Sequence, residues 1–574
     1  MPGSPLLLVN DLSVEFSTDS GNIMAVEGAS FRMNEAETLA IVGESGSGKS
    51  VTALSLLKLI PSPPGFIRKG TAMFSDRNGI KKDLLKVTER EMQEIRGSHI
   101  SMIFQEPMTS LNPVFTCGDQ VSESLREHLN LSKKEARERT VGLFEEVSLP
   151  RPAQLFSSYP HQLSGGQKQR VMIAMAISCN PSILIADEPT TALDVTVQKT
   201  ILELLIKLQQ KREMAILFIT HDLSLISNFA NRVMVMYQGK IVEEGNTNDI
   251  FTRPNHPYTK GLLACRPPLD MRLRHLPTIE DFISSAGKPS GQVIGLQERK
   301  DSHKEIYAKP ALIEVSGMSK YFTHNSSFLF GKEISISALE KVSFAVYPGE
   351  TLGIVGESGS GKTTVARSML ELIPPTEGRI FYNNTDITQI SPGKFKRLRK
   401  DLQIIFQDPF SSLNPRVTAG SAILEPMKVH KLHGSGAARK EKVMELLKLV
   451  GLKEAHYFRY PHEFSGGQRQ RICIARVLAV EPKLIICDES VSALDVSIQA
   501  QVLNLLNDLK RRLGLTYIFI SHDLSVVRFM ADRIIVMKNG KIEEIGEADA
   551  VFTKPQSDYT SALLAAIPVT KIKH

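Results

Sequence analysis

The feature that most constrains this chain is an ordered set of short motifs that occurs twice. Each half of the 574-residue sequence carries a glycine-rich GESGSGK[ST] segment, a glutamine just before Glu-Pro or Asp-Pro, an SGGQ segment, an apolar run ending in Asp-Glu, and a Ser/Thr-His-Asp triplet. The SGGQ serines, Ser164 and Ser465, are 301 residues apart, and so are the histidines His221 and His522. Because a chain of this length is too long for one core, we predict two similar domains and a linker.

The domain boundaries are predicted from where the repeats begin and end. We place the first domain at residues 1–267, a linker at 268–310 and the second domain at 311–574. The linker is mixed in charge, and Pro, Gly and Ser cluster in its SSAGKPSGQ stretch. This composition predicts a connecting segment with one short helix, and a docking element is the alternative.

Each half reads as an α/β domain. Short alternating strands are followed by a continuous apolar strand (38–43 and 351–356), the glycine loop and an amphipathic helix. Residues 120–155 and 420–455 show helical patterns and occupy the place where a helical subdomain would be inserted. The later ILIAD and LIICD runs are uninterrupted, as expected for a parallel sheet that is covered on both faces.

The glycine-rich segments are predicted to be phosphate-binding P-loops. Each follows a strand and opens a helix, which is the context that gives the motif its meaning. Backbone N–H groups of such a loop converge on phosphate oxygens at the positive end of the helix. The loop lysine, Lys49 or Lys362, would reach the β- and γ-phosphates, while Ser50 or Thr363 would ligate Mg²⁺.

Two adjacent carboxylates end a buried strand in each half. Asp187 and Asp488 would lie at the carboxyl edge of the sheet, where Mg²⁺ would bind. The next residue, Glu188 or Glu489, is the candidate general base for the attacking water.

A glutamine and a histidine in each half have two interpretations. Gln105 and Gln407 would contact Mg²⁺ or the water, or would only form a turn before proline. His221 and His522 would contact the γ-phosphate, or would be satisfied core histidines. The matching placement in both copies favours the functional interpretation.

The SGGQ segments form a second kind of anion site, because serine and two glycines lie at a helix N-terminus. One domain cannot easily aim both this site and the P-loop at a single nucleotide. We therefore predict a head-to-tail arrangement in which ATP binds between the P-loop of one half and the SGGQ segment of the other.

Together these motifs resemble the ATP-binding subunits of ATP-binding cassette (ABC) transporters, over both halves and excluding only the linker. The resemblance implies two tandem P-loop NTPase ABC nucleotide-binding domains, each with a RecA-like parallel-sheet core, an antiparallel β subdomain and an inserted helical subdomain. It also implies that the ALD aspartates, Asp194 and Asp495, cross the interface between the halves. Phe16 and Phe322 are candidates to stack on adenine, with buried core phenylalanines as the alternative.

The segments QEPMTSLNP, QDPFSSLNP, YPHQLSGGQ and YPHEFSGGQ, and the tails RPNHPYTKGLLACRP and KPQSDYTSALLAAIP, are similar to the peptide and nickel importer branch. This resemblance implies an energy-coupling ATPase at the cytoplasmic face of the inner membrane, with ATP and Mg²⁺ as cofactors. The implied partners are two integral-membrane permease subunits and an extracytoplasmic substrate-binding protein. Di- or oligopeptides are the expected substrates, with nickel, glutathione and antibiotic peptides left open.

Two departures from that branch qualify the resemblance. The second Asp-Glu pair is followed by Ser490 and Val491 where many members have Pro-Thr, and we expect small effects because Glu489 is kept. No cysteine-rich tail follows HPYT, so an iron–sulfur cluster is not predicted.

The alternative function is a soluble twin-cassette ATPase acting on ribosomes, which the net charge of +7 permits. Against it, the linker is not a long, strongly charged helical arm, and no aromatic-basic interleaving predicts a nucleic-acid surface. No apolar run approaches the roughly 18 residues needed to span a bilayer, and the beginning lacks a basic leader, so no direct membrane insertion is expected.

The predicted catalytic residues are Glu188, Glu489, His221, His522, Gln105 and Gln407. The predicted nucleotide-binding residues are Phe16, Gly43, Glu44, Ser45, Gly46, Ser47, Gly48, Lys49, Ser50, Ser164, Gly165, Gly166 and Gln167 in the first half, and Phe322, Gly356, Glu357, Ser358, Gly359, Ser360, Gly361, Lys362, Thr363, Ser465, Gly466, Gly467 and Gln468 in the second. The predicted magnesium ligands are Ser50, Gln105, Asp187, Thr363, Gln407 and Asp488.

Overall fold

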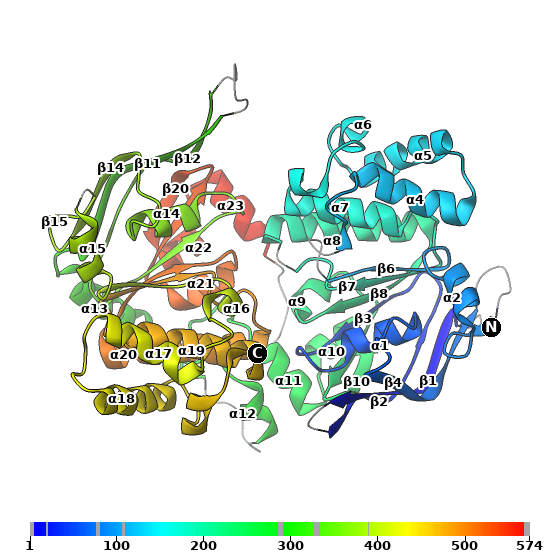
Figure 1. The fold of residues 1–574 in the computed structure, drawn as a ribbon, viewed down its shortest axis with the longest axis horizontal. Coiled ribbons are helices and arrows are strands. Elements are labelled where there is room, and N and C mark those ends of the chain that lie inside the picture. Colours follow the sequence, from blue (N-terminus) through cyan, green and yellow to red (C-terminus); the bar gives the residue numbers. More distant parts are fainter. Residues whose placement is uncertain are drawn as a thin grey trace. The chain divides into compact units, whose positions relative to one another are not determined.

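The structure is a computed structural model that describes residues 5–18, 21–75, 81–105, 110–191, 193–284, 291–325, 333–388 and 390–567. The chain divides into two compact units built on the same plan (Figure 1). The first contains the described residues up to Leu263 and also residues 282–284, while the second contains Ala264–Asp281 and the described residues from 291 to Ile567.

The core of the first unit is a six-stranded sheet in the order β10-β9-β3-β8-β7-β6. The strands β9, β3, β8, β7 and β6 pair in parallel, and β10 is antiparallel to β9. β3, β7 and β8 are buried along their whole length, as their uninterrupted apolar sequences predict. The strands are β3 (Thr38–Val42), β6 (Ile100–Ile103), β7 (Ile183–Asp187), β8 (Ala215–Thr220), β9 (Arg232–Tyr237) and β10 (Lys240–Asn246).

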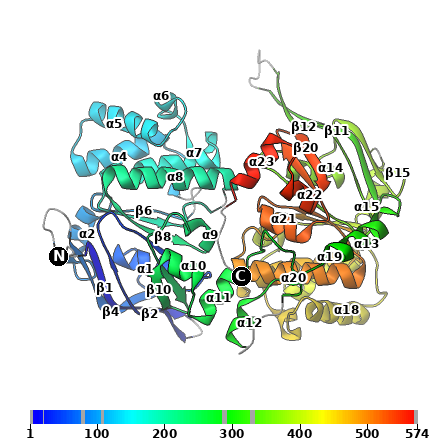
Figure 2. The ribbon, with the colours of Figure 1, turned by 180° about the vertical axis from the view of Figure 1, so that it is seen from behind.

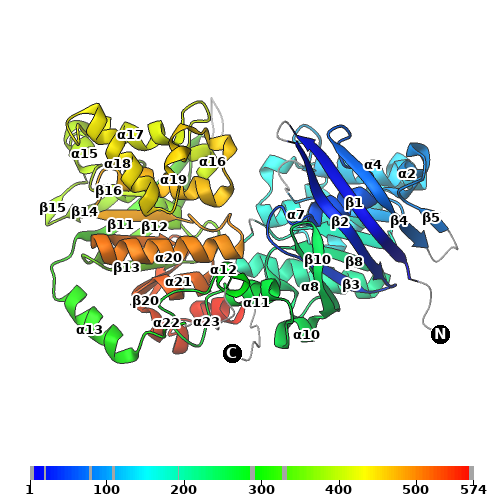
Figure 3. The ribbon, with the colours of Figure 1, turned by 90° about the horizontal axis from the view of Figure 1, so that it is seen from below.

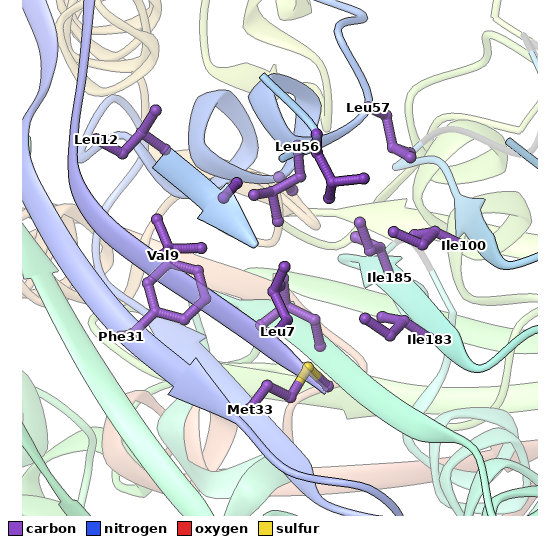
Figure 4. Packing of buried hydrophobic residues seen from close by; sticks show 14 of the residues in the cluster. Leu7, Val9, Leu12, Phe31, Met33, Leu56, Leu57, Ile100, Ile183 and Ile185 are labelled. Carbon is purple, nitrogen blue, oxygen red and sulfur yellow. The ribbon is translucent and has the colours of Figure 1, made fainter. Parts of the chain in front are cut away.

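A second, antiparallel sheet in the order β2-β1-β4-β5 packs on this core. Leu7 and Met33 from it share one hydrophobic cluster with Ile183 of the core sheet and with Leu56 of the helix that follows the glycine loop (Figure 4). The helix α1 (Lys49–Leu56) contacts β1, β2 and β7, so the two sheets together fix its position. The strands are β1 (Leu7–Thr18), β2 (Gly21–Met33), β4 (Gly65–Ser75) and β5 (Lys81–Asp83).

The predicted helical insertion is present in both units. In the first unit, α4 packs against α5 and α7, and these helices lie together beyond one edge of the core sheet (Figures 1 and 2). No helix in the described parts of the chain has the length and apolar composition needed to cross a bilayer. The other helices of the first unit are α2 (Glu89–Ile95), α4 (Cys117–Leu129), α5 (Lys133–Glu146), α6 (Pro152–Leu155), α7 (Gly165–Ala176), α8 (Val195–Arg212), α9 (Leu223–Ile226), α10 (Thr247–Thr252) and α11 (Pro257–Ala264).

The second unit repeats both sheets, in the orders β16-β17-β18-β13-β19-β20 and β12-β11-β14-β15. Its strands are β11 (Ile313–Asn325), β12 (Glu333–Val346), β13 (Thr351–Val355), β14 (Glu377–Tyr382), β15 (Thr385–Asp386), β16 (Leu402–Ile405), β17 (Leu484–Asp488), β18 (Thr516–Ile520), β19 (Arg533–Lys538) and β20 (Lys541–Glu547). Its helices are α14 (Lys362–Met369), α15 (Pro392–Leu398), α16 (Pro409–Ser412), α17 (Ala419–Val429), α18 (Gly436–Leu449), α19 (Gly466–Leu478), α20 (Val496–Leu513), α21 (Leu524–Met530), α22 (Ala548–Thr553) and α23 (Asp558–Ala565).

The described part of the segment 268–310 contains two helices where one was predicted, α12 (Ile279–Ile283) and α13 (Leu296–Tyr307). Its described residues pack mainly with the second unit, and α13 lies beside β20 and α22 in Figure 3. The buried guanidinium of Arg299 forms ion pairs with Glu547, at 2.5 Å, and with Asp549. Earlier in the segment, the main-chain N–H of Leu276 donates to the side-chain amide oxygen of Asn504 and the Leu276 carbonyl accepts from the amide nitrogen, each at 2.8 Å. The segment is thus docked by specific polar contacts, which its composition did not indicate.

The docked segment also meets a largely buried carboxylate. Asp532 accepts hydrogen bonds of 2.8 Å from the Lys510 ammonium and from the Thr351 N–H, and the His303 ring of α13 lies 3.5 Å away. Burial raises the pKa of Asp532, but the Lys510 charge and the hydrogen bonds outweigh it and hold the pKa well below its usual range. In the first unit Asn231 accepts the corresponding hydrogen bond from Thr38, also at 2.8 Å.

We therefore expect Asp532→Asn to destabilise the second unit at neutral pH. The amide oxygen keeps the Thr351 bond but loses the Lys510 ion pair, which costs about 2 kcal/mol of unfolding free energy for a mostly buried pair. Because the pKa of Asp532 is lower in the folded protein than the unfolded value of about 3.9, the ionised carboxylate stabilises the folded state above that pH. The difference in unfolding free energy between wild type and variant should therefore shrink as the pH falls below about 4. Amide hydrogen exchange of peptides from β13 and β19 measures this destabilisation, and peptides from β3 and β9 of the first unit serve as the internal reference.

The matched control is Asp301→Asn, which changes an exposed carboxylate on α13. A wild-type exchange rate for Asp532→Asn at pH 7, or an equal effect of Asp301→Asn, would contradict the stabilising role of the Asp532 ion pair.

Candidate functional site

Each glycine loop is closed around its own lysine. Lys49 starts α1, is only 5% exposed, and donates hydrogen bonds of 2.8 Å to the carbonyl oxygens of Gly43 and Glu44. In the second unit Lys362 makes the same two bonds at the same distance with its own loop. A buried ammonium needs such acceptors, because an unpaired buried charge is strongly unfavourable. The positive group is thereby held at the mouth of the loop, ahead of the helix N-terminus.

Two loop glycines are needed because backbone passes close by. A Cβ on Gly43 would lie 2.2 Å from the Met236 carbonyl oxygen, and a Cβ on Gly48 would lie 2.4 Å from the Ala25 carbonyl oxygen. Gly48 also has a φ of 100°, a conformation that L side chains rarely adopt. The loop is therefore pressed against the end of β9 and against β2.

A hydroxyl and a carboxylate meet beside the lysine in both units. Ser50 Oγ donates to Asp187 Oδ1 and Thr363 Oγ1 donates to Asp488 Oδ1, each at 3.0 Å. Burial raises the pKa of Asp187 to about 6, against the hydrogen bond from Ser50, and it raises the pKa of Asp488 likewise. Hydroxyl and carboxylate oxygens are the hard donors that Mg²⁺ prefers, so these pairs fit that ion.

The two candidate bases have an unusual backbone conformation. Glu188 and Glu489, which follow β7 and β17, each have a φ of 48° in the left-handed region. Hydrogen bonds from their N–H groups to Ile219 and Ile520 of the neighbouring strands, at 2.9 and 3.0 Å, hold this conformation. Such a conformation costs about 1 kcal/mol or more for a residue with a side chain, and it is typical of functional sites.

In the first unit three side chains converge on one carboxylate oxygen. Gln105 Nε2 at 3.3 Å, Thr191 Oγ1 at 2.9 Å and His221 Nδ1 at 3.1 Å all approach Oε2 of Glu188. Burial raises the pKa of Glu188, but the hydrogen bond and charge of His221, together with Thr191, outweigh burial, and the net pKa is lowered. Glu188 is thus held as an oriented carboxylate.

The second unit repeats this arrangement with one difference. Gln407 Nε2 lies 2.8 Å and His522 Nδ1 3.6 Å from Oε2 of Glu489. Ser492 Oγ instead donates to the main-chain oxygen of Glu489, at 2.8 Å. Burial raises the pKa of Glu489, but His522 outweighs it and the net pKa is lowered; Glu489 in turn raises the pKa of His522 against the effect of burial.

The SGGQ residues lie apart from this constellation. Ser164 and Ser465 are exposed and form capping boxes with Gln167 and Gln468 at the starts of α7 and α19. Their described polar contacts are thus with their own helices, not with the P-loop of the same unit. Asp194 similarly caps α8 by accepting the Val197 N–H at 3.0 Å.

The two phenylalanines that are candidates to stack on adenine differ in their exposure. Phe16 is partly buried against the first hydrophobic cluster, whereas Phe322 is 43% exposed with the Lys320 ammonium 5.4 Å above its ring. Residues 106–109 of the QEPMTSLNP segment lie outside the described residues. Adenine stacking by either phenylalanine stays a prediction.

Sequence reasoning missed three contributors to the sites. One is Thr191, which donates to Glu188. The other two are tyrosines of the tail segments. Tyr258 Oη accepts the Glu44 N–H at 3.0 Å, and Tyr559 Oη accepts the Glu357 N–H at 3.3 Å. The signal was present, because both tyrosines belong to the tail segments, but a tail-to-loop contact cannot be seen in a linear motif.

Comparison with known proteins agrees with this geometry. The profile of the ABC transporter family matches residues 26–191 and 339–492, and that of the oligopeptide/dipeptide transporter C-terminal region matches 242–291 and 544–574. The glutathione import ATP-binding protein GsiA of Salmonella paratyphi A is 48% identical over 565 residues, covering 98% of this chain and 90% of the relative. GsiA of Escherichia coli K12 is 48% identical over 568 residues, with 99% and 90% coverage.

The two units are therefore ATP-binding cassettes, and the protein is an ATPase. The chain belongs to the ABC transporter family. The predicted family and the predicted fold class are confirmed, and the relatives favour the transporter over the ribosomal alternative.

We expect Gly48→Ala to weaken ATP binding and to lower stability by about 1–3 kcal/mol, because the new Cβ meets the Ala25 carbonyl and the backbone is left-handed. Calorimetric ATP titration and thermal unfolding measure both effects. The control is Gly142→Ala in α5, where a Cβ meets nothing within 4 Å and the change should be neutral or slightly stabilising. Equal ATP affinity in both variants would contradict the tight loop geometry.

Proposed function

We propose that this chain is the energy-coupling ATPase of an ABC importer for small peptides of the glutathione class. The observation that carries the hydrolytic part is the repeated constellation of a buried P-loop lysine, a hydroxyl–carboxylate pair and an oriented glutamate. Near-full-length similarity to proteins named for glutathione import supports the proposed substrate class.

In the proposed reaction a water molecule attacks the γ-phosphorus of ATP and ADP leaves. Glu188 Oε2, with its ionised carboxylate, orients this water and accepts its proton, and Glu489 does so in the second cassette. Lys49 and the loop N–H groups stabilise the negative charge on the β- and γ-phosphates. His221, which lies beside Glu188, would contact the γ-phosphate once ATP is bound.

We propose that Ser50, Asp187 and Gln105 hold Mg²⁺ in the first cassette, and that Thr363, Asp488 and Gln407 hold it in the second. The ion would neutralise charge between the β- and γ-phosphates. Both glutamines contact the neighbouring glutamate, at 3.3 and 2.8 Å, so a glutamine that ligates the ion or the water would exchange that bond for it.

Each ATP would also need an SGGQ segment from the opposite cassette. Ser465 would complete the first site and Ser164 the second, with the ALD aspartates Asp194 and Asp495 at the junction. Support comes from the motif logic and from the capping boxes, which place each SGGQ serine at the exposed start of a helix.

The proposed partners are two integral-membrane permease subunits and an extracytoplasmic binding protein, with this chain bound peripherally at the cytoplasmic face of the inner membrane. Exposed apolar side chains in the segments that follow the two glutamines support this docking. Phe410 is 62% exposed three residues after Gln407, and Phe115 is 55% exposed ten residues after Gln105. A helix from each permease subunit would cover these side chains.

We expect Glu188→Gln combined with Glu489→Gln to stop steady-state ATP hydrolysis and to trap a state with ATP bound, because the amide cannot accept the proton of the water. Either single variant should keep a measurable fraction of the rate. Phosphate release measures the hydrolysis rate. The control is Glu203→Gln, which changes an exposed residue on α8 and should leave the rate unchanged. Wild-type turnover by the double variant would refute the assignment of the base.

We expect the tagged chain, gently solubilised from membranes, to copurify with two multi-spanning proteins and a binding protein, identified by mass spectrometry. Phe410→Ser should reduce that recovery, whereas Leu513→Ser, an exposed change at the end of α20, should not. In the purified complex, ATPase activity should rise with binding protein loaded with glutathione. Stimulation by nickel but not by glutathione would overturn the substrate class, and ribosomal proteins without membrane partners would overturn the importer proposal.

A further inference from the structure

The tail of the first cassette contacts the P-loop through one tyrosine. Tyr258, in α11, is fully buried, and its hydroxyl accepts the backbone N–H of Glu44 at 3.0 Å. Its ring stacks on Tyr237 at the end of β9, with 4.2 Å between ring centroids and 30° between planes. Gly43 lies against Met236, the residue before Tyr237. Tyr258 and the P-loop therefore both pack against the end of β9.

The tyrosine is itself fixed by its surroundings. Glu243 of β10 accepts hydrogen bonds from the N–H groups of Asn255 and His256, at 2.7 and 3.1 Å, just before α11 begins. The Tyr258 N–H donates to Nδ1 of His256 at 3.2 Å. The hydroxyl therefore cannot leave the loop without moving the start of α11 away from the sheet.

The second cassette repeats this construction with different residues. Tyr559, in α23, accepts the Glu357 N–H at 3.3 Å, and Ser557 takes the place of His256 by accepting the Tyr559 N–H at 3.2 Å. Glu544 of β20 accepts the N–H groups of Gln556 and Ser557, at 3.0 and 3.1 Å. The hydrogen bond from the P-loop to a tail tyrosine thus occurs in both cassettes although the surrounding residues differ. It is therefore a feature of the cassette and not of one loop.

The contact fixes the peptide group that holds the lysine. The Gly43 carbonyl accepts from Lys49, and the N–H of the same peptide group, which is that of Glu44, donates to Tyr258, so this peptide group is held from both sides. We propose that Tyr258 and Tyr559 are positioning residues that keep each P-loop in its phosphate-binding shape. This gives the tail segments a role in ATP binding, and it rests on the proposed phosphate-binding role of the loops.

The two contacts are not equally strong, which makes the two ATP sites unequal. Tyr258 is fully buried on an aromatic partner, whereas Tyr559 is half-buried, its bond is longer, and the Lys538 ammonium lies 4.5 Å from its ring centroid where Tyr237 lies in the first cassette. Water can replace a partly exposed hydroxyl more readily than a buried one. Loss of the hydroxyl should therefore affect the first site more.

The test is Tyr258→Phe, which removes one oxygen and keeps the ring. In full-length protein carrying Lys362→Ala, so that calorimetry with ATP and Mg²⁺ reports the first site, we expect Kd to rise about fivefold, the typical value of one hydrogen bond. Tyr559→Phe in a Lys49→Ala background should raise Kd about twofold or less. In otherwise wild-type protein, Tyr258→Phe should raise KM for ATP at unchanged kcat, and it should lower the melting temperature of the nucleotide-free protein by no more than about 2–4 °C, the effect of one lost hydrogen bond.

Tyr237→Phe is the matched control, because it removes a hydroxyl that accepts from Gln238, not from the loop, and keeps the stacked ring. Unchanged Kd and KM in Tyr258→Phe, or the same change in Tyr237→Phe, would overturn the inference. A Kd change that comes with a fall in melting temperature of more than about 4 °C would also overturn it, since that indicates a structural role. Normal ATP binding at the first site by Lys49→Ala would instead refute the underlying P-loop assignment.

Discussion

Each cassette is organised around a buried lysine ammonium that donates hydrogen bonds to its own loop. Lys49 has the carbonyl oxygens of Gly43 and Glu44 as acceptors, and leaving such a charge unpaired would cost more than most single interactions contribute. The loop can close in this way because α1 is packed between two sheets and because glycines allow backbone contact with β9 and β2. The requirement for buried charge pairing thus determines the shape of the phosphate site.

The remaining chemistry follows from parallel strands that share one carboxyl edge. Gln105 follows β6, Glu188 follows β7 and His221 follows β8, and these strands are direct neighbours in the sheet. Their side chains therefore converge although they are distant in sequence, at the edge where ligands bind in such sheets. The same order in the second cassette brings Gln407, Glu489 and His522 together.

Much of this was predictable because the P-loop and Asp-Glu signals are local: strand, loop and helix are adjacent, and the motif specifies its own geometry. Contacts that depend on tertiary placement were not predictable, such as the Tyr258–Glu44 bond across 214 residues. The docking of α13 was missed for the same reason, since Arg299 and its partner Glu547 belong to segments with no sequence relation. Thr191 was missed because a threonine two residues after proline has no distinctive pattern, and adenine stacking by Phe16 remains a prediction.

The central claim is that one chain contains two ATP sites of the same kind, one at the P-loop of each cassette. Counting bound nucleotide tests it most directly, by titrating the full-length protein calorimetrically with ATP and Mg²⁺ under conditions too cold for turnover. The account predicts two ATP molecules per chain in the wild type and one each in Lys49→Ala and Lys362→Ala. A wild-type stoichiometry of one, or a lysine variant that still binds two, would contradict it.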